Sequence, residues 1–261
     1  MDTIQDYLNS GAKDIAPLLS LMLGKNQAQL IAYNDHCLSN EEKSKINKLI
    51  SQREKGVPFA YISGTKGFYH LEFKVTPDTL IPRPETELLI DIALDLFNQQ
   101  QHPKIIDLGT GSGIIAITLA DKNPKWNITA TDYSQSALNI AKQNTTTAIN
   151  FQKGSWFDAV PNKTFDLIVS NPPYIRENDP YLNDLTYEPI TALTSGRDGL
   201  DDIRIIIDNA PKHLNKDGYI LLEHGYDQQA KIIELLSVDF INIKTFKDYN
   251  KNDRAIVAQI K

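Results

Sequence analysis

The first part of the chain carries apolar residues at helical spacing, with no strand pattern between them. Residues 39–56 are a clear case: polar residues and glutamates open the segment, and Ile46, Leu49 and Ile50 fall on one face. Successive helical segments without strands are typical of a small bundle. We therefore predict an all-helical domain over residues 1–62.

A different pattern begins at residue 63. Residues 64–77 alternate apolar and polar side chains, which predicts a hairpin or two short strands. In the stretch that follows, Pro84 is suited to the first position of a helix, with glutamates in its first turn. We interpret residues 63–84 as a β-hairpin connector between two domains.

From residue 104 onward, apolar strand patterns alternate with helical ones. Strands are expected at 104–108, 127–132, 149–154, 164–171, 219–225, 241–249 and 253–260, and helices at 113–121, 134–144, 201–214 and 227–237. Repeated strand–helix units predict an α/β fold with a mainly parallel, seven-stranded sheet and helices on both faces. The last two strands, joined by the short turn NKND, predict an antiparallel hairpin at the edge. This domain spans residues 85–261.

Composition narrows the class of protein. Hydrophobic residues make up 41% of the 261 residues and charged residues 23%, as in an ordinary globular protein. The net charge of -6 gives no global attraction to phosphates, so we expect no direct nucleic-acid binding. Cys37 is the single cysteine, which excludes an intrachain disulfide and a cysteine-built metal site. Without a signal-like N-terminus or a long apolar run, we expect a cytoplasmic protein that does not enter a membrane.

The segment DLGTGSGI, residues 107–114, lies between a predicted strand and a predicted helix. Gly109, Gly111 and Gly113 let the chain turn sharply and let a ligand approach the backbone. Their spacing is G-x-G-x-G, not the G-x-G-x-x-G of dinucleotide sites. The loop therefore suits an uncharged or zwitterionic group, such as the amino-acid end of S-adenosyl-L-methionine (SAM). A plain tight turn is the alternative.

Two more residues follow strands at the same predicted sheet edge. Asp132 ends the second strand, where a carboxylate can accept hydrogen bonds from both hydroxyls of a ribose. Dinucleotide enzymes use the same device, so Asp132 alone does not separate SAM from NAD. Trp156 follows the third strand, and its indole could cover an adenine ring. The alternatives are a helix cap for Asp132 and an ordinary core residue for Trp156.

The motif NPPY follows the fourth strand and faces the same edge. Asn171 and Pro172 each precede a proline, so the loop is held extended, and neither Pro172 nor Pro173 has an N–H to donate. The Asn171 side-chain oxygen and the Pro172 carbonyl can accept both hydrogens of a planar –NH2 group, and Tyr174 can pack against the π-system that bears it. A strand-ending turn is the alternative.

This arrangement suits methyl transfer to an amide or aromatic amine nitrogen, whose lone pair is delocalised. Two acceptors favour a pyramidal nitrogen and aim its lone pair at a sulfonium methyl. The carbonyl dipoles favour the positive charge that develops on that nitrogen. Asn171 cannot take a proton at neutral pH, so we assign no general base. We expect no metal, because the sulfonium is already an activated electrophile.

The chain resembles the HemK/PrmC-type release-factor glutamine N5-methyltransferases. The resemblance covers most of residues 58–259. It is carried by PFAYISGTKGFYHLEFKVTPDTLIPRPETELL, DLGTGSGIIAITLA, GSWF, SNPPYI, YEPITALTSGRDGL, LLEHGYDQ and DRAIVAQ. LIPRPETE and YEPITALTSGRDGL are much more specific than the glycine loop or NPPY, which occur in many amino-methyltransferases.

The resemblance implies a class I SAM-dependent methyltransferase fold, which is Rossmann-like, preceded by a helical domain that docks the substrate. It implies methylation of the glutamine in the GGQ motif of class-I peptide-chain release factors, which modulates translation termination, with S-adenosyl-L-homocysteine as product. By the same resemblance, SAM would be bound by Gly109, Thr110, Gly111, Ser112, Gly113, Asp132, Trp156 and Asn171. Asn171, Pro172, Pro173 and Tyr174 would bind the glutamine, with Asn171, Pro172 and Tyr174 as the catalytic set. We expect a monomer whose partners are the release factors.

Two other functions fit parts of the pattern. An N6-adenine DNA methyltransferase or an RNA base amino-methyltransferase would bind an exocyclic amine in the same pocket. The acidic balance and the lack of a basic insert argue against it. A non-catalytic SAM-binding module would leave NPPY without a purpose.

Overall fold

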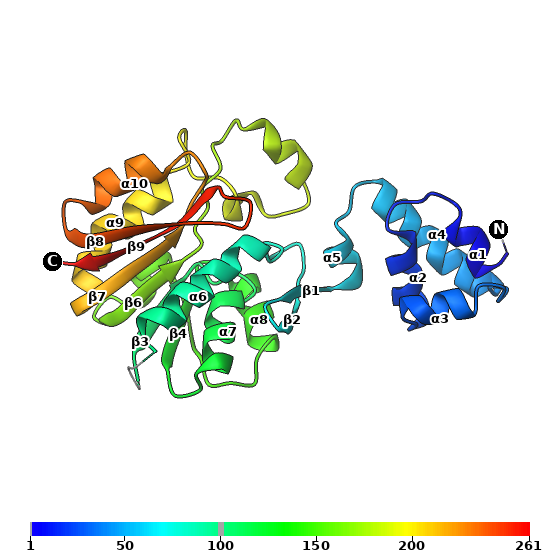
Figure 1. The fold of residues 1–261 in the computed structure, drawn as a ribbon, viewed down its shortest axis with the longest axis horizontal. Coiled ribbons are helices and arrows are strands. Elements are labelled where there is room, and N and C mark those ends of the chain that lie inside the picture. The colour runs from blue at the N-terminus through cyan, green and yellow to red at the C-terminus, as the bar shows by residue number, and fades with distance from the viewer. Residues whose placement is uncertain (1, 99–101) are drawn as a thin grey trace. The chain divides into compact units, whose positions relative to one another are not determined.

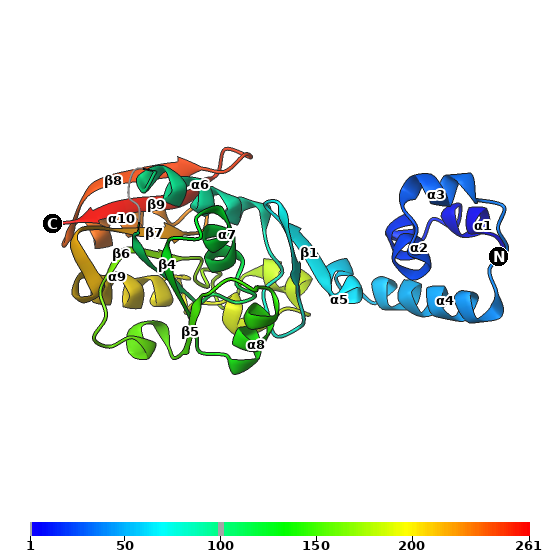
Figure 2. The same cartoon turned by 90° about the horizontal axis from the view of Figure 1, so that it is seen from below.

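The computed structural model describes residues 2–98 and 102–261, which form two compact units, Met1–Thr65 and Lys66–Lys261. The first unit is built from helices, and its α2 packs against α1, α3 and α4 (Figure 2). Its core is closed by Ile4, Tyr7, Leu18, Leu19, Leu30 and Ile46. The helices are α1 Ile4–Leu8, α2 Ile15–Leu23, α3 Gln27–Ala32, α4 Asn40–Glu54 and α5 Phe59–Ser63.

Local sequence determines where α4 begins. The Ser39 hydroxyl accepts a hydrogen bond from the Glu42 N–H, and the Glu42 carboxylate accepts one from the Ser39 N–H, which completes a capping box. Near the other end of α4, Arg53 pairs with Asp14 at 2.5 Å and donates to the Val57 carbonyl. The expectation that polar residues open this helix and that Ile46 lies on its buried face is confirmed.

The second unit is a seven-stranded sheet with helices on both sides (Figure 1). The strand order is β5-β4-β3-β6-β7-β9-β8, with β3 to β7 parallel and the β8–β9 hairpin antiparallel at one edge, as predicted. The strands are β3 Lys104–Leu108, β4 Asn127–Asp132, β5 Asn150–Lys153, β6 Phe165–Ser170, β7 Leu214–Glu223, β8 Phe240–Lys247 and β9 Asp253–Ile260. The helices are α6 Glu87–Leu96, α7 Ile114–Lys122, α8 Gln135–Gln143, α9 Asp201–His213 and α10 Gln229–Leu236, with 3-10 turns η1 Pro84–Thr86, η2 Trp156–Ala159, η3 Pro180–Leu185 and η4 Ile190–Ala192.

Alternate residues of each central strand pack into opposite cores, because successive side chains of a strand point to opposite faces. Ile105 packs with α6 and α7, whereas its neighbour Ile106 packs with α9 and α10. All of these side chains are almost fully buried. The strands therefore read as nearly continuous apolar runs, as expected for a parallel sheet covered on both faces.

The predicted hairpin is confirmed as β1 Thr65–Phe68 and β2 Leu71–Lys74. Its Phe68 and Phe73 side chains meet edge to face, and both belong to the core that contains α6 and α7. By this packing, most of the hairpin belongs to the second unit.

Several boundaries differ from the predictions, and two of the differences have a clear physical reason. Pro84 opens the 3-10 turn η1 and not an α-helix, and α6 begins three residues later. Strand β7 begins at Leu214, where an expected helix ends, because Leu214 pairs with Phe165 before the register shifts to Leu167–Tyr219. No helix in the described ranges 2–98 and 102–261 is long and apolar enough to span a bilayer.

The parallel strands end side by side, which sets the position of the site. Leu108 of β3 pairs with Thr131 of β4 and with Ser170 of β6, and Ser170 pairs with Leu222 of β7. The chain segments that leave these strands therefore share one sheet edge, where ligands bind in open α/β sheets.

Candidate active site

The loop from Gly109 to Gly113 connects β3 to α7 and is held by two buried carboxylates. The Gly111 N–H donates to Asp132 Oδ2 at 2.9 Å, and the Thr110 hydroxyl donates to Asp107 Oδ2 at 2.6 Å. The Ala116 N–H also donates to Asp107 Oδ2, at 3.2 Å. The loop is thus held by a carboxylate of β3, Asp107, and by one of β4, Asp132.

Asp132 keeps acceptor capacity for a ligand. Its Oδ1 accepts from the Ser134 N–H at 2.8 Å and its Oδ2 from Gly111, and each carboxylate oxygen can accept a second bond. Burial raises the pKa of this carboxyl, and the two N–H groups oppose the shift. The predicted alternative, a cap before Ser134, is also present in part, although Ser134 itself caps α8.

Trp156 lies against the glycine loop. Its backbone has φ of 47°, and a Cβ built on Gly109 would meet the edge of its ring at 3.3 Å. The positive φ of 69° at Gly109 and this short contact both favour glycine at the position. Trp156 also packs partly against the core beside α9, as its core alternative predicts, and its side of the cavity leaves the proposed contact with an adenine ring as a prediction.

These groups line a cavity of about 460 Å³, within the size range of small-molecule sites. Its wall includes Gly109, Gly111, Asp132, Trp156 and Asn171. Thr110, Ser112 and Gly113 are not among the lining residues, and the first two side chains are almost fully buried. The structure therefore brings together five of the eight predicted cofactor residues at one wall and uses Thr110 to support the loop.

The motif NPPY borders a second cavity of about 490 Å³. All four of its residues, Asn171 to Tyr174, line this cavity. The charged residues that share its wall are Arg83, Glu85, Arg176, Asp179, Glu223, Asp227 and Arg254.

Asn171 lies in the wall that the two cavities share. It lines both, together with Pro173, Leu80 and Ala192. Its Nδ2 donates to the Thr86 hydroxyl at 3.0 Å. Since an amide donates only through its nitrogen, this bond leaves the Asn171 oxygen as an acceptor for a ligand.

Sequence reasoning missed a buried carboxylate behind NPPY. Glu223 ends β7 and is 1% exposed, and its Oε1 accepts from the Tyr174 hydroxyl at 3.1 Å. Burial raises the pKa of Glu223 to about 7, against the opposing effects of Thr86, Arg254 and Tyr174. The available signal is an acidic residue directly after the apolar run YILL, at the carboxyl end of a strand.

Asp107 was missed as well. It is fully buried, and burial raises its pKa to about 7 even though Thr110 and Ala116 donate to it. Its position inside the run KIIDLG gives a signal, because a charge in a buried strand needs partners.

Two segments that carry the resemblance, LIPRPETE and YEPITALTSGRDGL, are joined directly in space. Arg83 pairs with Glu188 at 2.5 Å, and the Ile81 N–H donates to the same carboxylate at 2.9 Å. Glu188 is nearly buried. The pair fixes the segment between β6 and α9 over the two cavities that both segments line.

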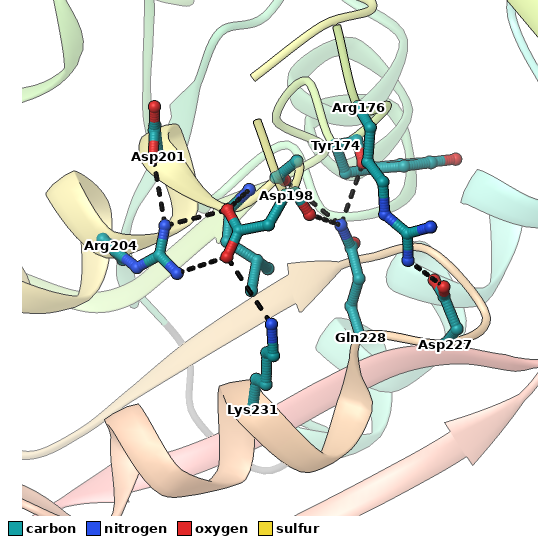
Figure 3. A network of polar contacts seen from close by, with 10 residues as sticks. Tyr174, Arg176, Asp198, Asp201, Arg204, Asp227, Gln228 and Lys231 are labelled. Atoms are coloured by element: carbon teal, nitrogen blue, oxygen red, sulfur yellow. Dashed lines mark hydrogen bonds and ion pairs between the residues drawn. The ribbon is translucent and has the colours of Figure 1, made fainter. Parts of the chain in front are cut away.

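Gln228 ties that segment to NPPY. Figure 3 shows its side chain directed at Tyr174, and its Nε2 lies 2.9 Å from the Tyr174 carbonyl and 3.2 Å from the Gly199 carbonyl. Its Oε1 accepts from the Gly225 N–H at 2.8 Å. Gly199 has φ of 77°, and a Cβ there would lie 2.3 Å from the Tyr174 carbonyl, so this contact requires glycine.

Ion pairs lie near the Gln228 side chain, at Asp198 and at Asp227. Asp198 accepts from Arg204 at 2.6 and 3.0 Å and faces Lys231 at 3.6 Å (Figure 3). The Arg204 guanidinium holds the pKa of the Asp198 carboxyl well below its usual range. Arg176 pairs with Asp227 at the rim of the NPPY cavity.

The sheet order and the glycine loop are those of a methyltransferase fold, and the comparison with family models gives the same class. A family model described as Methyltransferase small domain matches residues 86–252, and one described as PrmC N-terminal domain matches residues 5–64. A release factor glutamine methyltransferase of Coxiella burnetii is 43% identical over 251 residues, which cover 94% of this chain and 91% of that one. The chain belongs to the release factor glutamine methyltransferase family.

Solved structures agree on the fold. The hMettl16 catalytic domain, solved in complex with the MAT2A 3'UTR hairpin 1, superposes with a TM-score of 0.61 at 18% identity, covering 99% of this chain and 95% of that chain. The Thermus thermophilus 16S rRNA N2 G1207 methyltransferase, in complex with AdoMet and guanosine, gives 0.57 at 14% identity, covering 76% and 50%. Methyltransferases with this fold thus include one that holds AdoMet, the same compound as SAM.

Proposed function

We propose that the chain transfers the methyl group of SAM to the side-chain amide nitrogen of the glutamine in the GGQ motif of class-I peptide-chain release factors. The observation that carries this proposal is the meeting of the two cavities at Asn171. A methyl donor in one cavity and an amide in the other would have their reacting atoms side by side at that residue.

The cavity beside the glycine loop suits SAM. The backbone of Gly109 and Gly111 allows close approach, Asp132 retains acceptor capacity for ribose hydroxyls, and the Trp156 indole offers a flat apolar surface for a base. When bound, SAM supplies an activated methyl group on a sulfonium. Thr110, Ser112 and Gly113 support this site through the conformation of the loop.

The NPPY cavity suits a glutamine side chain. The Asn171 oxygen is left free by the bond from Nδ2 to Thr86, and the Pro172 carbonyl is the second acceptor. Together they hold the two amide hydrogens and favour positive charge on the nitrogen as the methyl is transferred. Pro173 and Tyr174 complete the wall, and the half-buried Tyr174 is fixed through its hydroxyl and its carbonyl.

The helical unit, residues 1–62 with the connector that follows, serves in this proposal to dock the release factor. Support comes from the match of the PrmC N-terminal domain model to residues 5–64. We further propose that the enzyme acts as a monomer in the cytoplasm, where its substrates work, without binding nucleic acid directly and without a metal.

Labelled SAM tests this function. The enzyme is incubated with a class-I release factor, with the same factor carrying alanine for the GGQ glutamine, or with duplex DNA. Label on the intact factor alone is the expected result. Label on the alanine variant would mean that the enzyme methylates a residue other than the GGQ glutamine. Label on DNA would favour an adenine amino-methyltransferase.

A further inference from the structure

Glu223 is a buried carboxylate at the wall of the NPPY cavity, and only one of its two oxygens has a hydrogen-bond partner. Its Oε1 accepts from the Tyr174 hydroxyl, while its Oε2 has no hydrogen-bond partner of good geometry in the part of the chain that the structure describes. A buried acceptor without a partner is costly, so its neighbours are informative.

The neighbour that leads to the reaction site is Thr86. Its oxygen accepts from Asn171 Nδ2 at 3.0 Å, so its single hydrogen is free to be donated elsewhere. The Thr86 hydroxyl also acts on the Glu223 carboxylate as a donor that lowers its pKa, although the two side chains form no hydrogen bond of good geometry in this structure. Thr86 is fully buried, so no solvent competes for that hydrogen.

The ionisation state of Glu223 therefore determines the direction of this chain of hydrogen bonds. A carboxylate can only accept, so Thr86 donates to it and accepts from the Asn171 NH2. A carboxylic acid can donate to Thr86, which frees the Thr86 hydrogen to point at Asn171. The amide can then turn, with its oxygen toward Thr86 and its NH2 toward the cavity, where it no longer accepts hydrogens from a substrate amide.

The charged and titratable groups that face Glu223 keep both states accessible. Arg254 of β9 favours the carboxylate, and so do the hydrogen bond from Tyr174 and the neighbouring Thr86 hydroxyl. Burial and the nearby Glu85 favour the acid, and burial is the larger effect, which brings the pKa to about 7.

We propose that Glu223 is a positioning residue whose carboxylate, acting through Thr86, holds the Asn171 amide with its oxygen toward the reacting nitrogen. This inference rests on the proposed function. Asn171 makes the contact with substrate, and Glu223 sets the orientation of Asn171. No bond of the substrate forms or breaks at Glu223.

The test compares wild type with Glu223→Gln, Thr86→Val and Thr86→Ser. In wild type, kcat should rise with pH and level off above a midpoint near 7, with about a tenfold loss one pH unit below the midpoint. Glu223→Gln and Thr86→Val should lower the plateau kcat, by up to about a hundredfold, and abolish this pH dependence. Thr86→Ser keeps the hydroxyl and should keep the dependence. The dissociation constant for SAM should stay within about twofold of wild type in all variants.

A second measurement separates this inference from the proposed function. The side-chain NH2 signal of Asn171, followed by 1H–15N NMR in the SAM-bound enzyme without release factor, should titrate near pH 7 in wild type and not in Thr86→Val. An Asn171 signal that does not titrate, or a wild-type kcat profile in Glu223→Gln, overturns the inference. Absence of methylated release factor at every pH, with the NMR titration present, overturns the proposed function alone.

Discussion

Asn171 is the residue on which the proposed reaction depends, and its environment is asymmetric. Its nitrogen is bonded to Thr86 and its oxygen is left for a ligand. A carboxylate at this position could not donate to the Thr86 oxygen. A leucine would offer no acceptor to the ligand. The amide combines one fixed donor with one free acceptor, which suits the positioning of an –NH2 group.

Replacing Asn171 with alanine should separate turnover from cofactor binding. We expect kcat to fall by about a hundredfold, because the substrate nitrogen loses one of its two acceptors and its alignment. SAM affinity should change by no more than about 1 kcal/mol, the scale of one hydrogen bond. Single-turnover kinetics and calorimetry measure the two quantities.

The control is Asn178→Ala. Asn178 is an exposed amide in the same segment between β6 and α9, and it lines neither of the two cavities. It should behave as wild type. Wild-type turnover by Asn171→Ala would contradict the assignment of the pocket.

The buried Asp107 carboxyl should make the free energy of unfolding depend on pH. Its pKa is about 7 in the folded protein and 3.8 as the ordinary value, so the folded state holds its proton more tightly. Its stabilising contribution is therefore complete below about pH 4 and is lost as pH rises to 7. The free energy of unfolding of wild type relative to Asp107→Asn should fall over that range by up to about 4 kcal/mol. Urea unfolding at several pH values measures it, and a constant difference would be the contrary result.

At the scale of elements, the side chain of Gln228 joins three segments that are distant in sequence. It connects the start of α10 to the end of NPPY and to the turn before α9. It is 4% exposed, so water cannot replace these bonds. These bonds, which we call the Gln228 clamp, hold the NPPY loop at Tyr174. Tyr174 follows the two prolines, so its own backbone is not fixed by a proline ring.

Gln228→Leu keeps the volume and removes the bonds. We expect a loss of about 1–3 kcal/mol for each buried group left without a partner, and a fall in kcat larger than the change in SAM affinity. Lys231→Gln is the matched control. Lys231 lies on α10, and the substitution removes its exposed ion pair with Asp198, which should cost less than about 1 kcal/mol. Equal stabilities of the two variants would show that the clamp does not hold the loop.

The sequence predicted these elements well because their signals are local. Strand patterns, the cap of α4 and the glycine loop all depend on neighbouring residues, and the structure has them where expected. The start of β7 was missed because the pairing of Leu214 with Phe165 is a tertiary contact. Glu223 and Gln228 were missed for the same reason, since their shared partner Tyr174 comes from another element.

At the scale of the whole molecule, the two units have separate cores, and both cavities belong to the second unit. A ligand that binds only one unit stabilises that unit alone, unless the two unfold together. Both tryptophans, Trp126 and Trp156, lie in the second unit, so tryptophan fluorescence follows its unfolding.

SAM at about 100 times its dissociation constant should raise the stability of the second unit by about 2.7 kcal/mol and leave hydrogen exchange in α4 unchanged. Asp132→Ala should reduce the gain, because the ribose loses its acceptor and the Gly111 N–H loses its partner. Equal protection of α4 by SAM would mean that the two units unfold as one.

The most direct test of the central claim is fragmentation mass spectrometry of a class-I release factor after incubation with the enzyme and SAM. We predict one added methyl group, located on the side-chain nitrogen of the GGQ glutamine, and none when Asn171→Ala replaces the wild-type enzyme. A methyl group on any other residue, or an unmodified factor after incubation with SAM-bound wild-type enzyme, would contradict the account.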